Sequence, residues 1–380
     1  MSSTLFICGS IEPGKNGVGD YTRMLAEGFV NQGQFVSIIA VNEKEFPIDL
    51  IPSYKKGKRN EINTYRLSSN LSWRVRQNIV IQLVDQLDPD IISLQFVPFS
   101  FHMKGLPYFL PSWLYGISKK PRKWHVMFHE LWIADSKVHS LKEWFIRESQ
   151  KFVITKLIKK LKFDLIDTSN YTYHNMLRKA GYESSIVPIF SNLPKGIRCV
   201  NYRINEDLEG KIVGVFFGKI VRSKGIINKI NALSGLIKEQ LNKELFILHI
   251  GGSNSSKTAV ILNSLSNKLN IKTKSLGFLN ADEAADILAS ADFGLSDYPV
   301  ELIQKSGSIA SMLYNELPVI LLCEEGNIQS FHFLEISCFH RELDFKAFIN
   351  QEKNFGVKYS SENAVLRLHN HFRKILNENE

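Results

Sequence analysis

Short apolar runs alternate with helical patterns along the chain, and this alternation restricts the fold more than any other feature. The runs are typical of buried strands, because each is only a few residues long and rich in Ile, Val, Leu and Phe. They span residues 4–9, 35–41, 90–95, 124–128, 164–169, 185–189, 211–217, 245–250, 272–276, 293–296 and 317–322. Alternating strands and helices predict an α/β fold with parallel sheets covered on both faces.

The pattern occurs twice, with a polar segment of weak periodicity in between. The length of 380 residues suits two domains. We predict a Rossmann-like domain over 1–195, a linker over 196–210, a second Rossmann-like domain over 211–360, and a C-terminal helix within 361–380 that packs across the domains. Doubly wound domains bind ligands at the carboxyl ends of their strands, so we expect the two to face each other across a cleft.

The net charge and the cysteines indicate which partners and which cellular compartment to expect. The net charge of +9 favours anionic partners, and basic residues cluster at 55–59, 119–123 and 142–162. The 4 cysteines show no metal or disulfide spacing, which favours a reducing compartment. Neither a targeting signal nor a membrane-spanning apolar run is visible. We therefore expect a cytoplasmic protein.

A glycine-rich loop separates the first apolar run from the first helical pattern. Gly17 and Gly19 stand where this helix is expected to begin. Glycines let a backbone approach a ligand closely, and a helix N-terminus presents free amides, so the loop suits a phosphate, a diphosphate or a sugar. The alternative is a tight turn without a ligand. The spacing matches neither the dinucleotide fingerprint nor the P-loop, so NAD and ATP are not predicted.

The second domain carries cations and hydroxyls after two of its strands. Such groups at a strand exit, next to a helix start, suit a diphosphate. For any single lysine the alternative is a solvated surface charge. The candidate phosphate-binding residues are Gly218, Lys219, Lys224, Lys305, Ser306, Gly307 and Ser308.

His129 follows the predicted strand 124–128, so it is expected at a carboxyl edge facing the cleft. A histidine there can hydrogen-bond a sugar hydroxyl or a reacting centre. The alternative is a structural histidine with its hydrogen bonds satisfied. The other histidines of the strands, His125 and His249, show no pairing pattern and are interpreted as structural. No histidine pattern resembles a zinc site, so no metal is predicted.

Several motifs follow one another along most of the chain. In order they are the glycine loop, His129, VPIFSNLP at 187–194, FGK at 217–219, KG at 224–225, LGFL at 276–279 and LPVI at 317–320. Their order and spacing resemble the GT-B fold glycosyltransferases of the family-4 type. The resemblance implies transfer of a sugar from a nucleotide-sugar donor, with retention and without an essential metal or other cofactor.

The resemblance also implies roles for matching residues. Gly17 and Gly19 match the glycine loop of the first domain, and His129 matches a histidine near the transferred sugar. Lys219 stands where the family usually has arginine, and with Lys224 it would bind the donor diphosphate.

In the second domain the match is mixed. Gly277 and Phe278 match the loop near the donor base. The family usually has two glutamates, with seven residues between them, before the LPVI strand, but Ile303 and Ser311 stand at those positions here. The Lys-Ser-Gly segment at 305–307 replaces the usual glycine-rich turn. Recognition of the ribose is therefore expected to differ.

The implied activity is transfer of a hexose to a saccharide or lipid-linked saccharide, in the synthesis of surface polysaccharides or glycoconjugates. The alternatives are a non-hydrolysing sugar-nucleotide epimerase and a non-catalytic homologue that binds a sugar nucleotide or a partner. Residues 141–162 combine aromatic and basic residues, which predicts peripheral binding to the anionic inner face of a membrane. The alternative is a helix that buries its apolar face in the domain. Without a recognised motif, nucleic acid is not an expected partner.

Overall fold

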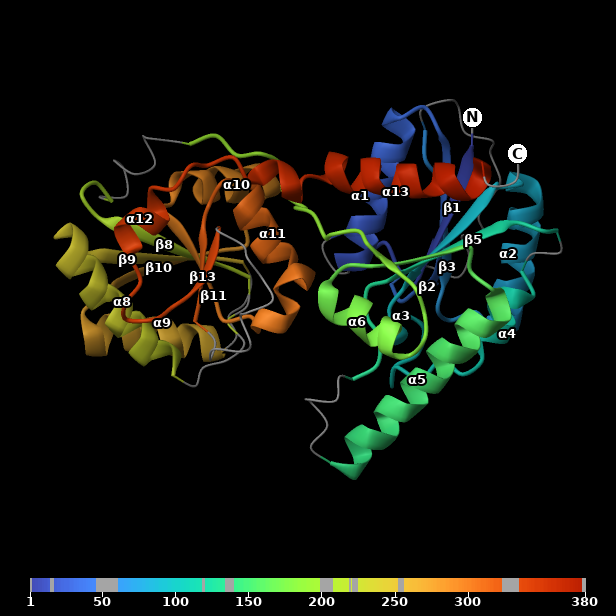
Figure 1. Cartoon of the computed structure of the whole chain (residues 1–380), viewed down its shortest axis with the longest axis horizontal. Helices are drawn as coiled ribbons and strands as arrows, with labels where there is room; N and C mark the ends of the chain where they lie inside the picture. Colours follow the sequence, from blue (N-terminus) through green and yellow to red (C-terminus); the bar gives the residue numbers. More distant parts are fainter. Residues whose placement is uncertain are drawn as a thin grey trace. The chain divides into compact units, whose positions relative to one another are not determined.

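The computed structural model describes residues 2–13, 17–45, 61–117, 120–133, 140–198, 208–218, 220, 225–251, 256–322 and 335–377. The chain forms two compact units, Met1–Pro188 with Ser361–Glu380, and Ile189–Ser360 (Figure 1). Each unit has a parallel sheet with helices, so the predicted α/β class and doubly wound architecture are confirmed. Much of the predicted linker, residues 199–207, lies outside the described residues.

The described part of the first unit contains a seven-stranded parallel sheet in the order β3-β2-β1-β4-β5-β6-β7. Its strands are β1 (Ser3–Cys8), β2 (Phe35–Glu43), β3 (Asn63–Ser68), β4 (Ile91–Phe96), β5 (Lys123–Phe128), β6 (Leu165–Thr168) and β7 (Ser185–Ile186). Its helices are α1 (Gly17–Asn31), α2 (Trp73–Leu87), α3 (Pro98–Phe101), α4 (Leu110–Tyr115), α5 (Leu141–Leu161), α6 (Tyr171–Lys179) and α13 (Ser361–Asn377). The strand order reverses between β1 and β4, where such folds bind ligands.

The described part of the second unit contains a six-stranded parallel sheet in the order β10-β9-β8-β11-β12-β13. Its strands are β8 (Ile212–Phe217), β9 (Leu245–Ile250), β10 (Lys272–Gly277), β11 (Phe293–Ser296), β12 (Val319–Leu321) and β13 (Ile336–Cys338). Its helices are α8 (Ile226–Leu241), α9 (Ser256–Leu269), α10 (Ala281–Ser290), α11 (Gly307–Tyr314) and α12 (Phe345–Ile349), with the 3₁₀ turns η2 (Val300–Lys305) and η4 (Gly356–Tyr359). The reversal here lies between β8 and β11.

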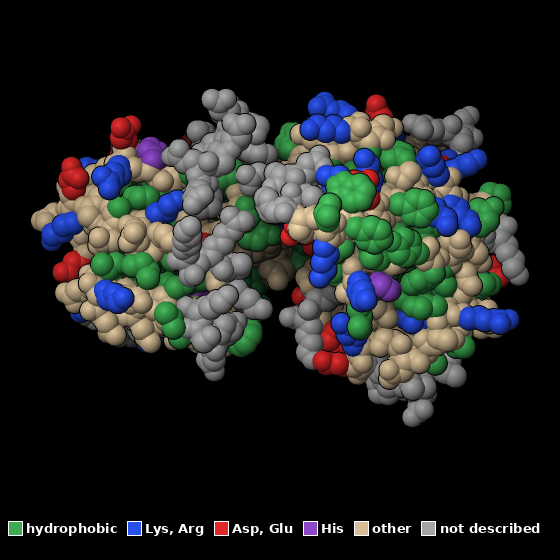
Figure 2. Space-filling model, turned by 90° about the horizontal axis from the view of Figure 1, so that it is seen from below, with side chains coloured by type: hydrophobic (Ala, Val, Ile, Leu, Met, Phe, Trp, Pro, Cys, Tyr) green, Lys and Arg blue, Asp and Glu red, His purple; other side chains and the backbone are tan. Residues whose placement is uncertain are grey.

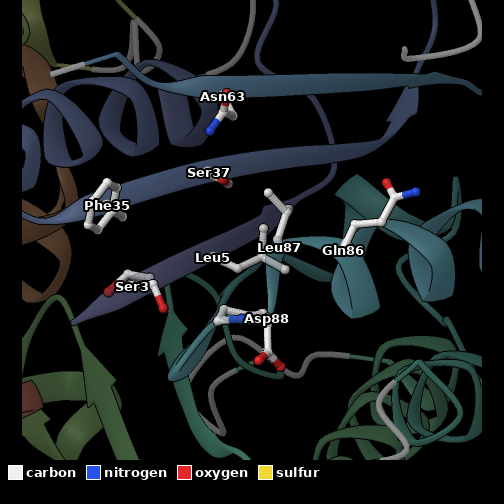
Figure 3. Close-up of a pocket in the computed structure, with 10 residues that line it drawn as sticks. Ser3, Leu5, Phe35, Ser37, Asn63, Gln86, Leu87 and Asp88 are labelled. Atoms are coloured by element: carbon white, nitrogen blue, oxygen red, sulfur yellow. The ribbon is translucent and has the colours of Figure 1, made fainter. Parts of the chain in front are cut away.

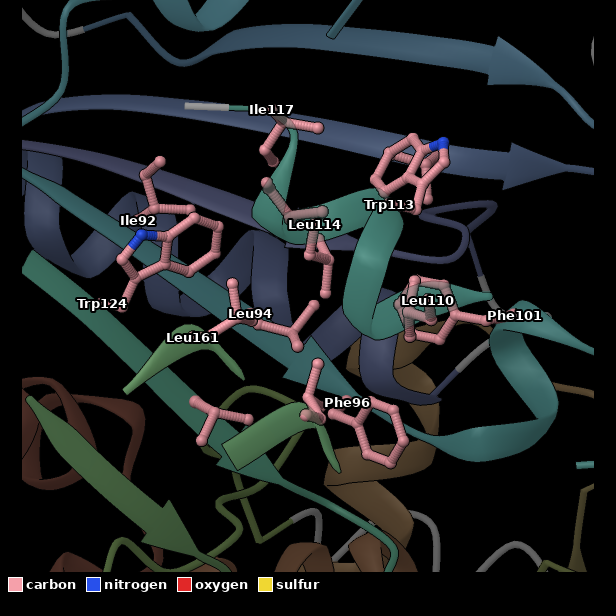
Figure 4. Close-up of a cluster of buried hydrophobic side chains, with 14 of the residues drawn as sticks. Ile92, Leu94, Phe96, Phe101, Leu110, Trp113, Leu114, Ile117, Trp124 and Leu161 are labelled. Carbon is pink, nitrogen blue, oxygen red and sulfur yellow. The ribbon is translucent and has the colours of Figure 1, made fainter. Parts of the chain in front are cut away.

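Alternate side chains of the strands supply the core of the first unit. Ile92, Leu94 and Phe96 of β4 are fully buried and lie on one face of the sheet, because strand side chains alternate (Figure 4). Trp113 and Leu114 of α4 cover them from the same side. Each such side chain contributes about 1.5–3 kcal/mol of hydrophobic free energy on burial.

The C-terminal helix packs inside the first unit, beside α1 (Figure 1). A Cβ atom at Gly28 would lie 2.3 Å from Cγ2 of Val365, so only glycine allows this close approach. The ring of Phe372 packs edge-on against Phe29 at 5.5 Å and against His125 at 5.0 Å. The last helix of the chain therefore completes the N-terminal domain.

Among the described residues, the length and apolar content of each helix fall short of what a membrane-spanning helix needs.

Candidate active site

The loop after β1 is held in one position by a buried carboxylate. Ile11 N donates to Oε1 of Glu43, and Ser10 Oγ donates to Oε2, both at 2.8 Å. Arg66 pairs with Glu43 at 3.1 Å and also contacts Glu12. The side chain of Glu43 is 1% exposed, so these contacts are well shielded from water. The backbone of residues 10–12 is thus anchored at the carboxyl edge of the sheet.

The two glycines predicted to bind ligand differ in their surroundings. A Cβ atom at Gly19 would lie 2.4 Å from Ser10 O and 2.7 Å from Ile11 Cα, so α1 needs glycine to pack on the anchored loop. A Cβ atom at Gly17 would meet nothing within 4 Å. Close packing within the chain thus accounts for Gly19, and the ligand role of Gly17 stays a prediction.

His129 lies directly after β5, at the carboxyl edge of the sheet, as the sequence analysis predicts. Its backbone N donates to Phe96 O at 3.0 Å, and its ring packs edge-on against Tyr21 at 4.9 Å. The ring nitrogen Nε2 lies 2.9 Å from Oε1 of Gln95. Because the residue is 3% exposed, its ring is firmly held. Its part in the chemistry stays a prediction.

His129 is one end of a series of polar side chains in contact inside the first unit, which we call the buried polar chain. Gln95 Nε2 donates to Ser93 Oγ at 2.9 Å, and Ser93 Oγ lies 2.8 Å from His125 Nδ1. His125 Nε2 is 3.3 Å from Asp167 Oδ2, which is ion-pair distance without the alignment of a hydrogen bond. The same oxygen lies 3.2 Å from Nδ1 of His371. The members are His129, Gln95, Ser93, His125, Asp167 and His371.

Asp167 carries the charge of the buried polar chain. Burial by itself raises the pKa of this carboxyl, but its contacts with the rings of His125 and His371 outweigh burial and hold the pKa below its ordinary value of 3.8. The neighbouring Tyr21 has a pKa raised by burial and by the charge of Asp167. Asp167 is therefore an ionised carboxylate at neutral pH, and Tyr21 is a neutral phenol.

Three glycines meet at the carboxyl edge of the second sheet. Gly218 follows β8 with φ +94°, Gly251 follows β9 with φ +112°, and Gly277 ends β10 with φ +70°. Gly251 N donates to Gly277 O at 2.8 Å, and a Cβ atom at Gly251 would lie 3.2 Å from Gly218 N and Cα. Other residues would be strained at these angles. The backbones of three adjacent strands therefore meet without side chains between them, and sequence reasoning missed the part of Gly251.

The helix α11 begins beside these glycines. Ser306 caps it, because its side chain accepts a hydrogen bond from Ile309 N at 3.3 Å, and its Oγ lies 3.0 Å from Ser308 Oγ. A Cβ atom at Gly218 would lie 3.8 Å from Cβ of Ser308. Gly307 is the first residue of α11, and Lys305 ends the preceding turn η2. The structure thus brings Gly218 and Ser308 together next to a helix N-terminus.

His249 supports the Gly218 loop from within the sheet. Its Nε2 lies 2.9 Å from Gly218 O and its Nδ1 3.1 Å from Ser275 Oγ. Burial lowers the pKa of His249, and the hydrogen bond to Gly218 opposes this only in part. His249 is therefore hydrogen-bonded on both ring nitrogens, and its structural role stays a prediction.

The other predicted site residues lie elsewhere in the structure or outside the described residues. Phe278 is 85% exposed and makes up part of the surface after Gly277. Lys219 and Lys224 lie outside the described residues. Gly17, Gly19 and His129 belong to the first unit, and the remaining candidates belong to the second.

The positions that depart from the expected glutamate pair are both buried. Ile303 is 4% exposed, and Ser311 is 0% exposed. Ser311 Oγ lies 3.1 Å from Ser191 Oγ and donates to Asn192 Oδ1 at 3.1 Å. Ser311 therefore binds residues of the motif at 187–194, within the second unit.

A pocket of about 310 Å³ lies at the opposite edge of the first sheet (Figure 3). Ser3, Phe35 and Asn63, which line it, stand at the amino ends of β1, β2 and β3, and Asp88 follows α2. Folds of this class bind ligands at the carboxyl ends, so we do not assign the candidate active site to this pocket.

Comparison with solved structures shows which proteins share this architecture. Sucrose-phosphate synthase from Thermosynechococcus elongatus is 14% identical with a TM-score of 0.63, and 100% of each chain is covered. HepE from Anabaena, solved in complex with UDP and glucose, is 12% identical with a TM-score of 0.61, again over 100% of each chain. A protein from Listeria monocytogenes assigned as a UDP-N-acetylglucosamine 2-epimerase is 11% identical, with a TM-score of 0.54 over 98% of this chain and 97% of that one.

No family model and no curated protein sequence matches the chain. The likeness to solved structures extends over the whole chain at low identity, so it establishes the fold. The two units form the GT-B fold, as expected from the sequence.

Proposed function

We propose that the protein is a glycosyltransferase that transfers a hexose from a nucleotide-sugar donor to a saccharide or lipid-linked saccharide. The observation that carries the proposal is the meeting of Gly218, Gly251 and Gly277 beside the N-terminus of α11. Bare backbone and free helix amides at a carboxyl edge suit a diphosphate. A solved structure of the same fold, HepE, holds UDP and glucose, which supports a donor of this class.

Within this proposal the donor binds mainly to the second unit. Lys219, Lys224 and Lys305 neutralise the departing diphosphate, and the amides and hydroxyls of Ser306 and Ser308 add hydrogen bonds. Such stabilisation of a leaving group is worth roughly 3 kcal/mol for each good donor. We propose the retaining, metal-independent chemistry of the family-4 type, which turnover in the presence of EDTA and analysis of the product anomer test.

We expect Lys224→Ala to lower turnover about a hundredfold, because it removes one cation from the leaving diphosphate. The assay is nucleotide release from a panel of nucleotide sugars, with and without saccharide and lipid-linked acceptors. The matched control is Lys238→Ala, which removes an exposed lysine of α8 in the same unit. Equal losses of turnover and of thermal stability in Lys224→Ala would show that this lysine is structural.

The same panel separates the two rival functions. An epimerase, favoured by the likeness to the Listeria protein, would convert one nucleotide sugar into its C2 epimer without an acceptor and without net release of nucleotide. A non-catalytic homologue would bind a nucleotide sugar and never turn it over. Either result would overturn the transferase proposal.

The acceptor side of the proposal rests on α5 and its neighbours. This helix buries Val153, Ile154 and Leu157 in the core, yet it also exposes large apolar side chains. Together with the segment 98–115 it forms a surface that we call the aromatic face. Its exposed apolar residues are Phe99, Met103, Tyr108, Tyr115, Leu141, Trp144, Phe145 and Phe152.

Ring and side-chain contacts join α5 to the segment 98–115. The rings of Tyr108 and Phe152 lie 6.4 Å apart, and Lys160 Nζ lies 5.2 Å from the ring centre of Tyr115. Figure 2 shows hydrophobic side chains gathered on this unit with Lys and Arg beside them. Large exposed apolar side chains gathered in this way support an interaction site.

The charges beside the aromatic face favour an anionic bilayer as its partner. Lys142, Lys151, Lys156 and Lys159 of α5 are exposed. In the 119–123 cluster, by contrast, Arg122 pairs with Asp88 at 2.8 Å and Lys123 with Asp164 at 3.0 Å. The 55–59 cluster lies outside the described residues. Each basic residue near an anionic surface adds about 1 kcal/mol to the free energy of membrane binding. We therefore propose that the protein is cytoplasmic and binds peripherally to the inner face of the membrane.

We expect the double variant Phe145→Ser/Phe152→Ser to bind anionic vesicles at least tenfold more weakly than the unmodified protein. The two rings are 61% and 57% exposed, so they are available to enter a bilayer. Flotation at low salt, with phosphatidylglycerol vesicles and with phosphatidylcholine vesicles, measures the effect. Leu366→Ser, which removes an exposed leucine of α13 in the same unit, is the control. No flotation with either lipid would contradict the membrane proposal and favour a soluble acceptor.

A further inference from the structure

We infer that Gln95, Ser93 and His125 are positioning residues, which hold His129 as its Nε2–H tautomer through hydrogen-bonded side chains that run from His125 to His129, with the carboxylate of Asp167 at ion-pair distance from His125. The consequence for catalysis rests on the proposed function, whereas the tautomer itself does not. The inference follows from the direction in which each group of the buried polar chain donates.

The direction of hydrogen-bond donation is set first at the carboxylate of Asp167. Asp167 is ionised and its side chain is 0% exposed, so both of its oxygens can only accept hydrogen bonds. Its Oδ2 lies 3.3 Å from His125 Nε2 and 3.2 Å from His371 Nδ1. Each of these ring nitrogens must therefore carry a proton to make a favourable contact. A neutral imidazole has one N–H, so the inference includes that His125 is neutral, with its proton on Nε2 and Nδ1 as the acceptor.

With Nδ1 of a neutral His125 as the acceptor, the directions of the next two hydrogen bonds are set. Because Nδ1 of His125 accepts, the hydroxyl of Ser93 donates to it across 2.8 Å. Ser93 and His125 are partners in the register of β4 and β5, so this contact is set by the sheet itself. The Ser93 oxygen is then free to accept from the amide of Gln95, whose Nε2 lies 2.9 Å away.

The orientation of the Gln95 amide determines which ring nitrogen of His129 carries the proton. Since its nitrogen faces Ser93, its oxygen faces His129, at 2.9 Å from Nε2. An amide oxygen accepts only, so Nε2 of His129 must carry the proton. The neutral ring then has its lone pair on Nδ1. Any proton that His129 takes up, or any hydroxyl that it accepts from, meets the ring at Nδ1.

The C-terminal helix is part of this arrangement. His371 of α13 is 23% exposed at its side chain, and it is the outermost contact of Asp167. Phe372 packs on the ring of His125. The final helix of the chain thus closes the far end of the buried polar chain, which explains why it belongs with the N-terminal domain rather than with the unit that precedes it.

The test is ¹⁵N NMR of the histidine rings in the full chain without any substrate, with His129 assigned from a His129→Gln spectrum. We expect the Nε2–H form of His129 to exceed the Nδ1–H form about tenfold in the unmodified protein. In Ser93→Ala the preference is expected to fall to about twofold, although Ser93 does not touch His129. Gln95→Leu, which removes the direct partner, should abolish the preference.

Ser184→Ala is the matched control, because it removes the partner of His174, at 3.1 Å from Nδ1, elsewhere in the same unit. It should leave His129 unchanged. A dominant Nδ1–H form in the unmodified protein, or an unaltered preference in a folded Ser93→Ala variant, would overturn the inference. Where the protein turns over a nucleotide sugar, Ser93→Ala should lower kcat about tenfold with little change in KM and shift the pH profile. Absence of any turnover would contradict the proposed function alone, since the NMR result stands independently.

Discussion

His129→Ala is expected to lower kcat between about a hundredfold and ten-thousandfold, which is the usual contribution of a positioned general acid or base. His129 stands at the carboxyl edge of β5, with Nε2 bound to Gln95 and its ring packed on Tyr21. These contacts orient the ring before substrate binds. The substitution therefore removes an interaction between the imidazole and the reacting groups, which would act during the reaction. The measurement is steady-state kinetics on the donor and acceptor identified by the nucleotide-sugar panel.

Stability must be followed in the same variant. His129→Ala leaves Oε1 of Gln95 without its partner, which costs about 1–3 kcal/mol. His174→Ala also removes a hydrogen-bonded histidine of the first unit, and it should leave kcat unchanged. A kcat within about threefold of the original value, in a folded His129→Ala variant, would favour the reading of His129 as a purely structural histidine.

Much of the fold was predictable because short apolar runs indicate buried strands. The strands expected in both halves are confirmed. The strand β3 was missed because it lies at the edge of its sheet and has only two apolar residues, which alternate with polar ones. Its buried Tyr65 and Leu67 are the signal that could have found it.

The site was less predictable than the fold. The buried polar chain joins residues that lie far apart in sequence, so no spacing reveals it. Its signal was the presence of Ser93, Gln95 and His125 within strands that are otherwise apolar. Polar side chains inside such strands must find partners when buried, so they mark a hydrogen-bonded network. Reading His125 as an isolated structural residue overlooked this requirement.

The helix at 141–162 shows why two sequence interpretations need not exclude each other. Its apolar residues were expected either to meet a membrane or to pack in the core. The structure buries one set, including Val153 and Leu157, and exposes another, including Trp144 and Phe145. Apolar residues on both faces make the helix weakly amphipathic, so periodicity alone could not separate the two sets.

Asp167→Asn is expected to lower the free energy of unfolding by about 3 kcal/mol near neutral pH. The substitution keeps the shape of the side chain but removes the charge that faces His125 and His371. The new amide presents a donor where the carboxylate only accepted, so His125 and His371 lose part of their attraction to this side chain. Chemical denaturation at pH 7 measures the loss. Asp88→Asn removes an exposed carboxylate that pairs with Arg122, and it should have a much smaller effect.

The pH dependence gives a sharper test of the same carboxylate. The folded pKa of Asp167 lies below its unfolded value near 3.8, because His125 and His371 favour the charged form. The folded state therefore releases this proton more readily than the unfolded state, so stability rises with pH across the interval between the two values. The contribution is complete above about pH 4 and is lost as the pH falls through the folded pKa.

The stability difference between the original protein and Asp167→Asn should consequently hold steady down to about pH 4 and shrink below it. A difference that already disappears between pH 7 and pH 5 would mean that Asp167 is protonated near neutral pH. In that case the carboxyl could itself donate a hydrogen bond, the direction of the buried polar chain would no longer be set at this end, and His129 would not be confined to one tautomer.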